Sequence, residues 1–376
     1  MVGLTTPVVY LDHAATSPTR PEAVTAMLPF LGGEFGNPSG SHSMARAART
    51  AIEDAREAMA AALGCAAGEV VFTGGGTEAD NLAVVGAPMG RRVCSAIEHH
   101  AVLLPVEHAG GVTVGVDADG LIDLDALGDA LSADDVVVSV MLANNETGVV
   151  QALDAVAEVV RARAPRALLH TDAVAAFSWV DVAQAASVAD MVSVSAHKFG
   201  GPKGVGVLVV RDGVAVEPIL RGGGQERERR SGTHNVAGIA GMSAAATSTV
   251  RDRAATVARV SALRDCLADA LSSVPDVRVT AANAVRTAGT LHVQVRGVES
   301  EALLIALDDA GICASAGSAC ASGALEPSHV LAAMGVENAW SQGALRLSLG
   351  WSTAEDDMNA AAVAIPKAIE MLRSRA

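Results

Sequence analysis

The chain has 376 residues, of which 50% are hydrophobic but only 2% aromatic, so small aliphatic side chains must fill the interior. Its formal net charge of −15 disfavours unspecific binding to a phosphate backbone, and direct nucleic-acid contact is not expected. No apolar run reaches the roughly eighteen residues that a membrane span requires, and the length allows two or three domains' worth of core.

The N-terminus and the cysteines favour a cytoplasmic protein. Residues 1–7 have no basic segment followed by an apolar stretch, which argues against a secretory signal. The five cysteines are an odd number and form no C-x-x-C pair. This pattern is typical of a reduced compartment, with neither a disulfide framework nor a zinc site.

Strand-like and helix-like segments alternate through the first two thirds of the chain. The strand-like runs are 69–73, 92–95, 112–114, 136–142, 167–171, 191–195 and 206–210, and helical patterns such as 77–85 and 152–162 separate most of them. Buried apolar strands interleaved with helices predict an α/β fold with a mainly parallel sheet that is covered on both faces.

The pattern changes after a long alanine-rich helical stretch at 235–272. Runs 277–280 and 290–295 alternate like half-exposed strands, and 299–309 and 353–373 are helical. We therefore expect a large domain at 15–255 and a smaller α+β domain formed by 1–14 and 256–376. The basic cluster at 221–230 is mixed with glutamates, which favours a solvated or dimer-interface loop over a nucleic-acid patch.

A lysine stands in a tight, glycine-rich turn after the strand-like run 191–195. A lysine in such a partly desolvated turn can lose its proton and attack a carbonyl. Ser195 and His197 precede Lys198 and add donors suited to a phosphate. The segment indicates a lysine that anchors pyridoxal phosphate (PLP). The alternative is a strand-to-turn junction with an exposed lysine.

Four other segments suit a planar phosphate-bearing cofactor. The turn at 73–81 offers backbone N–H groups at a helix start and the Thr77 hydroxyl, or it is an ordinary glycine turn with a threonine N-cap. His99 can stack on a ring and pass protons, Asn145 can bond a ring oxygen, and Asp172 can hold a pyridine nitrogen protonated. The alternative for His99 is a structural histidine. For Asn145 it is a loop of turn formers, and for Asp172 it is a helix N-cap.

Two further residues suit a reaction on a small amino acid. Small residues surround Cys320 throughout 315–328, so its thiol can swing between two positions, whereas free cysteines are usually buried. Arg346 lies on the alternating run 344–350 and suits a bidentate hold on a carboxylate. The alternatives are a loop with an incidental cysteine and an edge-strand arginine in a surface ion pair.

These segments, in this order, resemble the cysteine desulfurases, the class V branch of the fold-type I PLP enzymes. The likeness runs from Tyr10-Leu-Asp-His-Ala-Ala-Thr to Arg346-Leu-Ser-Leu-Gly, and the long loop around Cys320 is similar to that of group I, the iron–sulfur and tRNA-thiolation type. The resemblance implies the fold-type I architecture, with a large domain and a smaller α+β domain, and a homodimer with its sites at the interface.

The resemblance also implies a role for each motif residue. Lys198 would hold PLP as a Schiff base, His99 would stack on the ring and move protons, and Cys320 would take the sulfur. Further PLP contacts are implied for Gly76, Thr77, Asn145, Asp172, Ser195, His197 and, from the neighbouring subunit, Thr233. Arg346 and Asn145 would contact the substrate L-cysteine. No resident metal is implied, but Cys320 is open to transient ligation of an iron–sulfur cluster.

The chain departs from the family at one position that bears on the cofactor. The family usually reads Asp-Ala-x-Gln where this chain has Asp172-Ala-Val-Ala175, and that glutamine bonds the PLP ring oxygen. We expect a water or another side chain to replace it. A smaller departure is Met44, where the family often has glycine.

The implied activity is conversion of L-cysteine to L-alanine, with the sulfur passing as a persulfide on Cys320 to an acceptor in iron–sulfur assembly or thiolation. Two classes of alternative stay open. A PLP-dependent aminotransferase or selenocysteine lyase would share the lysine, the aspartate and the phosphate cradle. A catalytically decayed scaffold is the other, and Ala175 makes it worth testing.

Overall fold

The computed structural model describes residues 8–317 and 328–374, and its largest element is a seven-stranded sheet with the order β2-β8-β7-β6-β5-β3-β4. All neighbours in it pair in parallel except those of β8, which is antiparallel to both β2 and β7. The strands are β2 (Val70–Thr73), β3 (Arg91–Ser95), β4 (Val112–Val114), β5 (Asp135–Ser139), β6 (Leu168–Asp172), β7 (Met191–Ser195) and β8 (Gly206–Val210). The predicted mainly parallel sheet is confirmed.

Helices cover this sheet on both faces. Val137 and Val138 are consecutive on β5 yet belong to different apolar clusters, because successive side chains of a strand point to opposite faces. The helices of this part are α1 (Pro21–Leu31), α2 (Ser43–Leu63), α3 (Gly76–Val85), α4 (His100–His108), α5 (Leu124–Ala130), α6 (Leu153–Arg163) and α7 (Val182–Ala185).

A second core is built on a three-stranded antiparallel sheet of order β12-β10-β9, with the short parallel pair β1-β11 beside it. Its strands are β1 (Val9–Tyr10), β9 (Val277–Val279), β10 (Thr290–Val295), β11 (Ile312–Cys313) and β12 (Ala344–Ser348). Its helices are α9 (Ser300–Asp309), α10 (His329–Ala333), α11 (Asn338–Ser341) and α12 (Glu355–Arg373). This part is the smaller α+β unit expected from the change of pattern.

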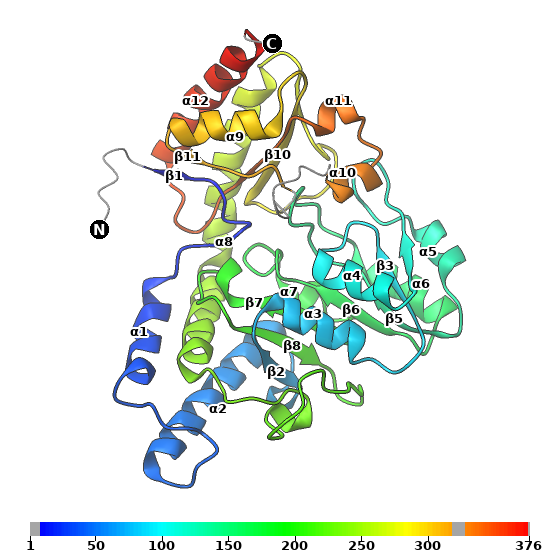
Figure 1. The fold of residues 1–376 in the computed structure, drawn as a ribbon, viewed down its shortest axis with the longest axis vertical. Coiled ribbons are helices and arrows are strands. Elements are labelled where there is room, and N and C mark those ends of the chain that lie inside the picture. The colour runs from blue at the N-terminus through cyan, green and yellow to red at the C-terminus, as the bar shows by residue number, and fades with distance from the viewer. Residues whose placement is uncertain (1–7, 318–327, 375–376) are drawn as a thin grey trace.

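One long helix, α8 (Val236–Ser272), joins the two cores. It has 37 residues and is therefore about 55 Å long. Met242 packs in the first core and Leu267 in the second, and Figure 1 shows the helix running from the side of α1 and α2 up to α12. The division near residue 255 stays a proposal, which these two cores support.

Several predicted boundaries shift by one to three residues, and the start of α12 has a local reason. The strand expected at 136–142 ends at Ser139. The closing helix begins at Glu355 rather than Thr353. The Thr353 hydroxyl accepts from the Gly350 N–H and the Asp357 carboxylate accepts from the Ala354 N–H, so these polar side chains close a turn before the helix and cap its start.

Candidate active site

Most of the predicted site residues line one cavity of about 500 Å³. Asp172 and Ser195 end the neighbouring strands β6 and β7, and carboxyl ends of parallel strands meet at one edge of a sheet. Arg346 reaches the same cavity from β12, so the cavity lies between the two cores. The predicted residues in its wall are Gly76, Thr77, His99, Asn145, Asp172, Ser195, His197, Lys198 and Arg346.

Lys198 ends a single 3₁₀ turn, Ala196–Lys198, directly after β7. Its Nζ donates to the carbonyl oxygens of Ala14 and Ala15, the second at 3.1 Å. Burial, and after it the positive charge of Arg346, lowers the pKa of Lys198 to about 8. The neutral amine, which is the form that attacks a carbonyl, is therefore far more populated near neutral pH than for an ordinary lysine, although the protonated form still predominates at pH 7.

The start of α3 forms an anion cradle beside Lys198. The helix begins at Gly76, directly after Gly75, whose φ of +147° favours glycine. A Cβ on Gly76 would lie 2.9 Å from Val174 Cγ2, so a side chain there would fill the space. Burial, and then Lys198, lowers the pKa of His197 to about 4. The cradle therefore offers a helix N-terminus, hydroxyls and a neutral imidazole to a phosphate.

His99 is held in one tautomer by the backbone. It is the N-cap of α4, and its Nδ1 accepts from the Ala101 N–H at 3.1 Å. Burial, followed by the charge of Lys198, lowers the pKa of His99 to about 4. The ring is therefore neutral near pH 7, and because Nδ1 is an acceptor, its proton sits on Nε2.

Asp172 lies among buried acids that the sequence analysis missed. Its Oδ1 accepts from the Val174 N–H at 2.8 Å, and burial raises its pKa to about 6 against the effects of that bond and of Lys198. Asp80 and Glu98 are 1% and 0% exposed, and burial, followed by repulsion from Asp172, raises the pKa of both. The only sequence signal was that Asp80 shares a helix turn with Ala79, Leu82 and Ala83, which are all buried.

Arg346 is paired within the chain. Its Nη2 lies 2.9 Å from Asp12 Oδ1, and its Nη1 donates to the Asn145 carbonyl at 3.1 Å. It is 4% exposed, so it is not the surface edge-strand arginine of the alternative interpretation. The sequence analysis missed Asp12, although it belongs to the Tyr10-Leu-Asp-His motif. A substrate carboxylate at Arg346 must compete with that carboxylate.

Cys320 lies outside the described residues, but the segments on either side of it meet at the cavity. Gly317 and His329 both line the cavity. The Ser328 hydroxyl donates to Glu146 Oε2 at 2.6 Å, and a Cβ on Gly317 would lie 3.1 Å from the same oxygen. Gly317 and Ser328, which flank the 318–327 segment, therefore both lie against the buried carboxyl group of Glu146.

Thr233 is the predicted residue that the structure does not bring to this cavity. It is exposed on the loop between β8 and α8. An exposed position is compatible with reaching a neighbouring subunit, which is the role that the resemblance implies. That role stays a prediction.

The described residues contain neither a candidate metal centre nor a helix suited to a membrane. Within residues 8–317 and 328–374, no group of three or more histidine, cysteine, aspartate or glutamate side chains could hold a metal ion. In the same ranges, none of the helices combines the length and the apolar character of a membrane-crossing segment.

The sequence profile of the class V aminotransferases matches residues 9–360. An IscS-like cysteine desulfurase of Mycobacterium tuberculosis is 44% identical over 98% of this chain and 98% of its own. Among solved structures, a NifS-like protein superposes with a TM-score of 0.90 and 32% identity over 97% of this chain and all of its own. SspA, solved in complex with cysteine, superposes with a TM-score of 0.78 and 29% identity. The match covers 90% of this chain and 98% of the SspA chain.

These matches extend over nearly the whole of each protein and include both cores and the cavity between them. The resemblance to cysteine desulfurases drawn from the motifs is thereby confirmed. The chain belongs to the class V aminotransferase family and, within it, to the cysteine desulfurases.

Proposed function

We propose that this protein converts L-cysteine to L-alanine with PLP bound at Lys198, and that Cys320 carries the released sulfur as a persulfide. The single observation that carries the proposal is the convergence of Lys198, Asp172 and Arg346 on the cavity where the Cys320 segment begins and ends. The family implies dependence on PLP, and SspA, a structural relative, was solved in complex with cysteine.

The residues of the cavity fit PLP. The Lys198 amine faces the same space as Asp172, which would sit at the pyridine nitrogen, and the Gly76 cradle would take the phosphate. Thr77, Ser195 and His197 would complete the phosphate contacts, with Thr233 reaching in from a second subunit. PLP, when bound, supplies an electron sink for the charge left on the substrate Cα.

The protein side chains would bind the substrate and transfer its protons. Arg346 would bind the cysteine carboxylate and Asn145 would line the substrate pocket. Lys198, released by the incoming substrate amine, would take the Cα proton. His99 carries its proton on Nε2 and would move protons between the substrate thiol and Cβ.

The sulfur step balances without an outside oxidant. The Cys320 thiolate attacks the substrate sulfur, an S–S bond forms and the Cβ–S bond breaks. The electron pair of that bond stays on carbon, which takes up a proton and becomes the methyl group of alanine. Cysteine and enzyme thiol thus become alanine and enzyme persulfide.

Replacement of Cys320 tests this assignment. Cys320→Ser is expected to keep the cofactor absorbance and the spectral change on adding L-cysteine but to lose sulfide release and protein persulfide. Cys266→Ser, at an exposed cysteine, is the matched control and should behave as the wild type. Full sulfide production by Cys320→Ser would reject the assignment.

Alanine formed from cysteine without a keto acid distinguishes a cysteine desulfurase from the alternative functions. An aminotransferase would need a keto acid, and a selenocysteine lyase would prefer the selenium substrate. A decayed scaffold would be colourless after reconstitution with PLP. Lys198→Ala should abolish the lysine-linked absorbance band, and borohydride treatment of the wild type should leave the pyridoxyl group on residue 198.

The persulfide requires an acceptor. We propose a homodimer that hands sulfur to a protein of iron–sulfur assembly or thiolation, with Cys320 as a transient ligand to a nascent cluster. A cytoplasmic location belongs to the same proposal and is supported by the cysteine pattern of the sequence. Capture of persulfide acceptors by the wild type, compared with Cys320→Ser, tests the partner.

A further inference from the structure

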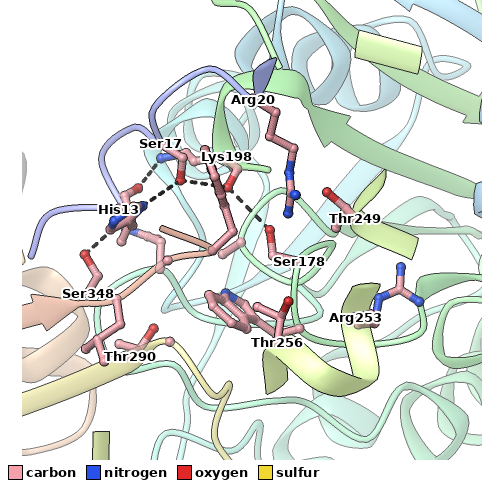
Figure 2. Close-up of a pocket in the computed structure, with 18 residues that line it drawn as sticks. His13, Ser17, Arg20, Ser178, Lys198, Thr249, Arg253, Thr256, Thr290 and Ser348 are labelled. Carbon is pink, nitrogen blue, oxygen red and sulfur yellow. Dashed lines mark hydrogen bonds between the residues drawn. The ribbon is translucent and has the colours of Figure 1, made fainter. Parts of the chain in front are cut away.

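A second, smaller cavity of about 40 Å³ lies beside Lys198 (Figure 2). Its wall is formed by residues that precede α1, by α8 and by the segment after β12. Ala175 and Lys198 line both this cavity and the larger one. The position where the family usually has glutamine is thus part of the boundary between the two spaces.

The charged side chains in this wall are all basic. Arg20, Lys198 and Arg253 line the cavity together with His13, and no aspartate or glutamate is among the lining residues. Burial lowers the pKa of His13 to about 4, so the imidazole is neutral at physiological pH. The cavity therefore has a net positive wall.

Arg20 is one of the two arginines of this wall. It is 7% exposed, its Nε donates to the Phe199 carbonyl at 3.1 Å, and its guanidinium stacks on Trp351. Across the described ranges, no acidic oxygen lies within 4 Å of its nitrogens. In the same ranges its two terminal nitrogens donate to no protein acceptor, and they retain access to solvent at the cavity. The charges of Glu22 and Asp252 favour its protonated form, but both carboxylates form ion pairs with Arg251.

Arg253 and the Thr256 hydroxyl also offer this cavity hydrogen-bond donors that are unpaired in the described part of the chain. Arg253 Nε is buried without a hydrogen-bond partner, and its Nη1 lies 3.6 Å from Asp181, whose side chain is 59% exposed and solvated. The Thr256 hydroxyl lines the cavity and donates to no acceptor in the described residues. Figure 2 shows the Arg20 guanidinium directed toward Thr249 and Ser178 at the cavity.

We propose that this cavity is a binding site for a single small inorganic anion, chloride in the cell, held by Arg20, Arg253 and the Thr256 hydroxyl. Within the described residues, Arg253 Nε is buried without a partner and the terminal nitrogens of Arg20 donate to no protein acceptor. An anion with charge-assisted hydrogen bonds to both guanidinium groups would offset the cost of their partial desolvation. A cavity needs roughly 10–15 Å³ to hold one water, so about 40 Å³ takes a monatomic ion but excludes a peptide carboxylate or a phosphoester.

A crystal of the holoenzyme soaked in bromide tests the site directly. Anomalous scattering should show one bromide between Arg20 and Thr256, and the peak should disappear when excess chloride competes. Arg20→Gln should lose the peak, whereas Arg166→Gln, an exposed arginine on the surface, should keep it. Water density alone under the same soak, or a peak that persists in Arg20→Gln, overturns the proposal.

Tryptophan fluorescence gives a second readout that does not depend on turnover. Two of the three tryptophans, Trp179 and Trp351, line the cavity, and bromide quenches indoles that it touches. At constant ionic strength, quenching by bromide should saturate and chloride should reverse it, whereas gluconate should not. A purely linear dependence on bromide contradicts the site.

Thr256→Val covers the case in which Arg20→Gln does not fold. This change removes one donor and conserves shape, so the bromide affinity should fall roughly tenfold, as for one hydrogen bond to a charged group. Unchanged affinity in Thr256→Val would remove its hydroxyl from the site and overturn the arrangement proposed. All three measurements are independent of sulfur transfer, so failure here and failure of the desulfurase assignment are distinguishable.

Discussion

The Lys198 amine has surroundings that disfavour its positive charge. Burial and Arg346 lower its pKa from 10.5 to about 8, and only the neutral amine attacks the aldehyde of PLP. We expect the rate at which apoprotein incorporates PLP to rise with pH and to level off above about 8. Absorbance stopped-flow over a pH series measures this rate. A rate that still rises tenfold per pH unit at pH 9 would contradict the lowered pKa.

Asp80 shows how one buried carboxyl group affects stability. Its raised pKa means that the folded protein holds a proton there which the unfolded chain releases above a pKa of 3.8. Stability is therefore lost as the pH rises above that value, by up to ~1.4 kcal/mol per pH unit for one proton. Asp80→Asn cannot ionise and should gain in stability relative to the wild type as the pH rises. Denaturant unfolding of the apoprotein between pH 4 and 8 tests the trend, and a constant difference would refute it.

At the scale of elements, the loop between β8 and α8 contains the longest left-handed run of non-glycine residues in the part of the chain that the structure describes. Glu226, Arg227 and Glu228 have φ values of 48°, 56° and 67°, a left-handed run without glycine. Glu226 is 5% exposed and accepts from both terminal nitrogens of Arg56 at 2.8 Å and from the Phe72 N–H at 2.9 Å. These bonds fix the loop that carries Thr233.

Loss of the negative charge of Glu226 should destabilise the fold. Burial alone would raise the pKa of Glu226, but hydrogen bonds from Arg56 and His234 hold it at about 2. Glu226→Gln leaves Arg56 buried without its counter-ion, and we expect a loss of about 3–5 kcal/mol near pH 7. Because the wild-type contribution is present above the unfolded pKa of 4.5 and disappears as the pH falls through about 2, the difference should shrink on acidification.

The exposed Glu228 of the same loop provides the control for this prediction. Glu228→Gln should unfold within about 0.5 kcal/mol of the wild type, as a surface change does. Equal effects of the two substitutions would mean that the Arg56 pair is not what holds the loop.

Which parts of the molecule could be predicted depended on the kind of signal in the sequence. Short apolar runs located β6 and β7, an alanine-rich stretch located α8, and motifs at strand ends indicated the residues of the main cavity. The strand order, the two-residue pair β1-β11 and the acids Asp80 and Glu98 left no comparable pattern. A single buried acid, or an arginine such as Arg20, is distinguished only by neighbours from distant segments.

At the scale of the whole molecule, α8 sets the position of one core against the other. Ala255 is exposed at its centre, between the parts packed in each core. Ala255→Pro should cost about 3 kcal/mol and kink the helix, which would displace Arg346 relative to Lys198 and raise the KM for L-cysteine. Ala255→Gly should cost about 1 kcal/mol without a kink. Steady-state kinetics and unfolding of both variants test this, and an unchanged KM in a folded Ala255→Pro would show that α8 does not set the geometry.

The pairing of the N-terminal strand has a consequence for biosynthesis. β1 pairs in parallel with β11, Asp12 binds Arg346, and the carbonyls of Ala14 and Ala15 accept from Lys198. Val9 and Asp12 must therefore wait for partners that are translated more than 300 positions later. The nascent chain therefore cannot complete this cavity before β11 and β12 have been synthesised, and vitamin B6 would be acquired only at that late stage of biosynthesis.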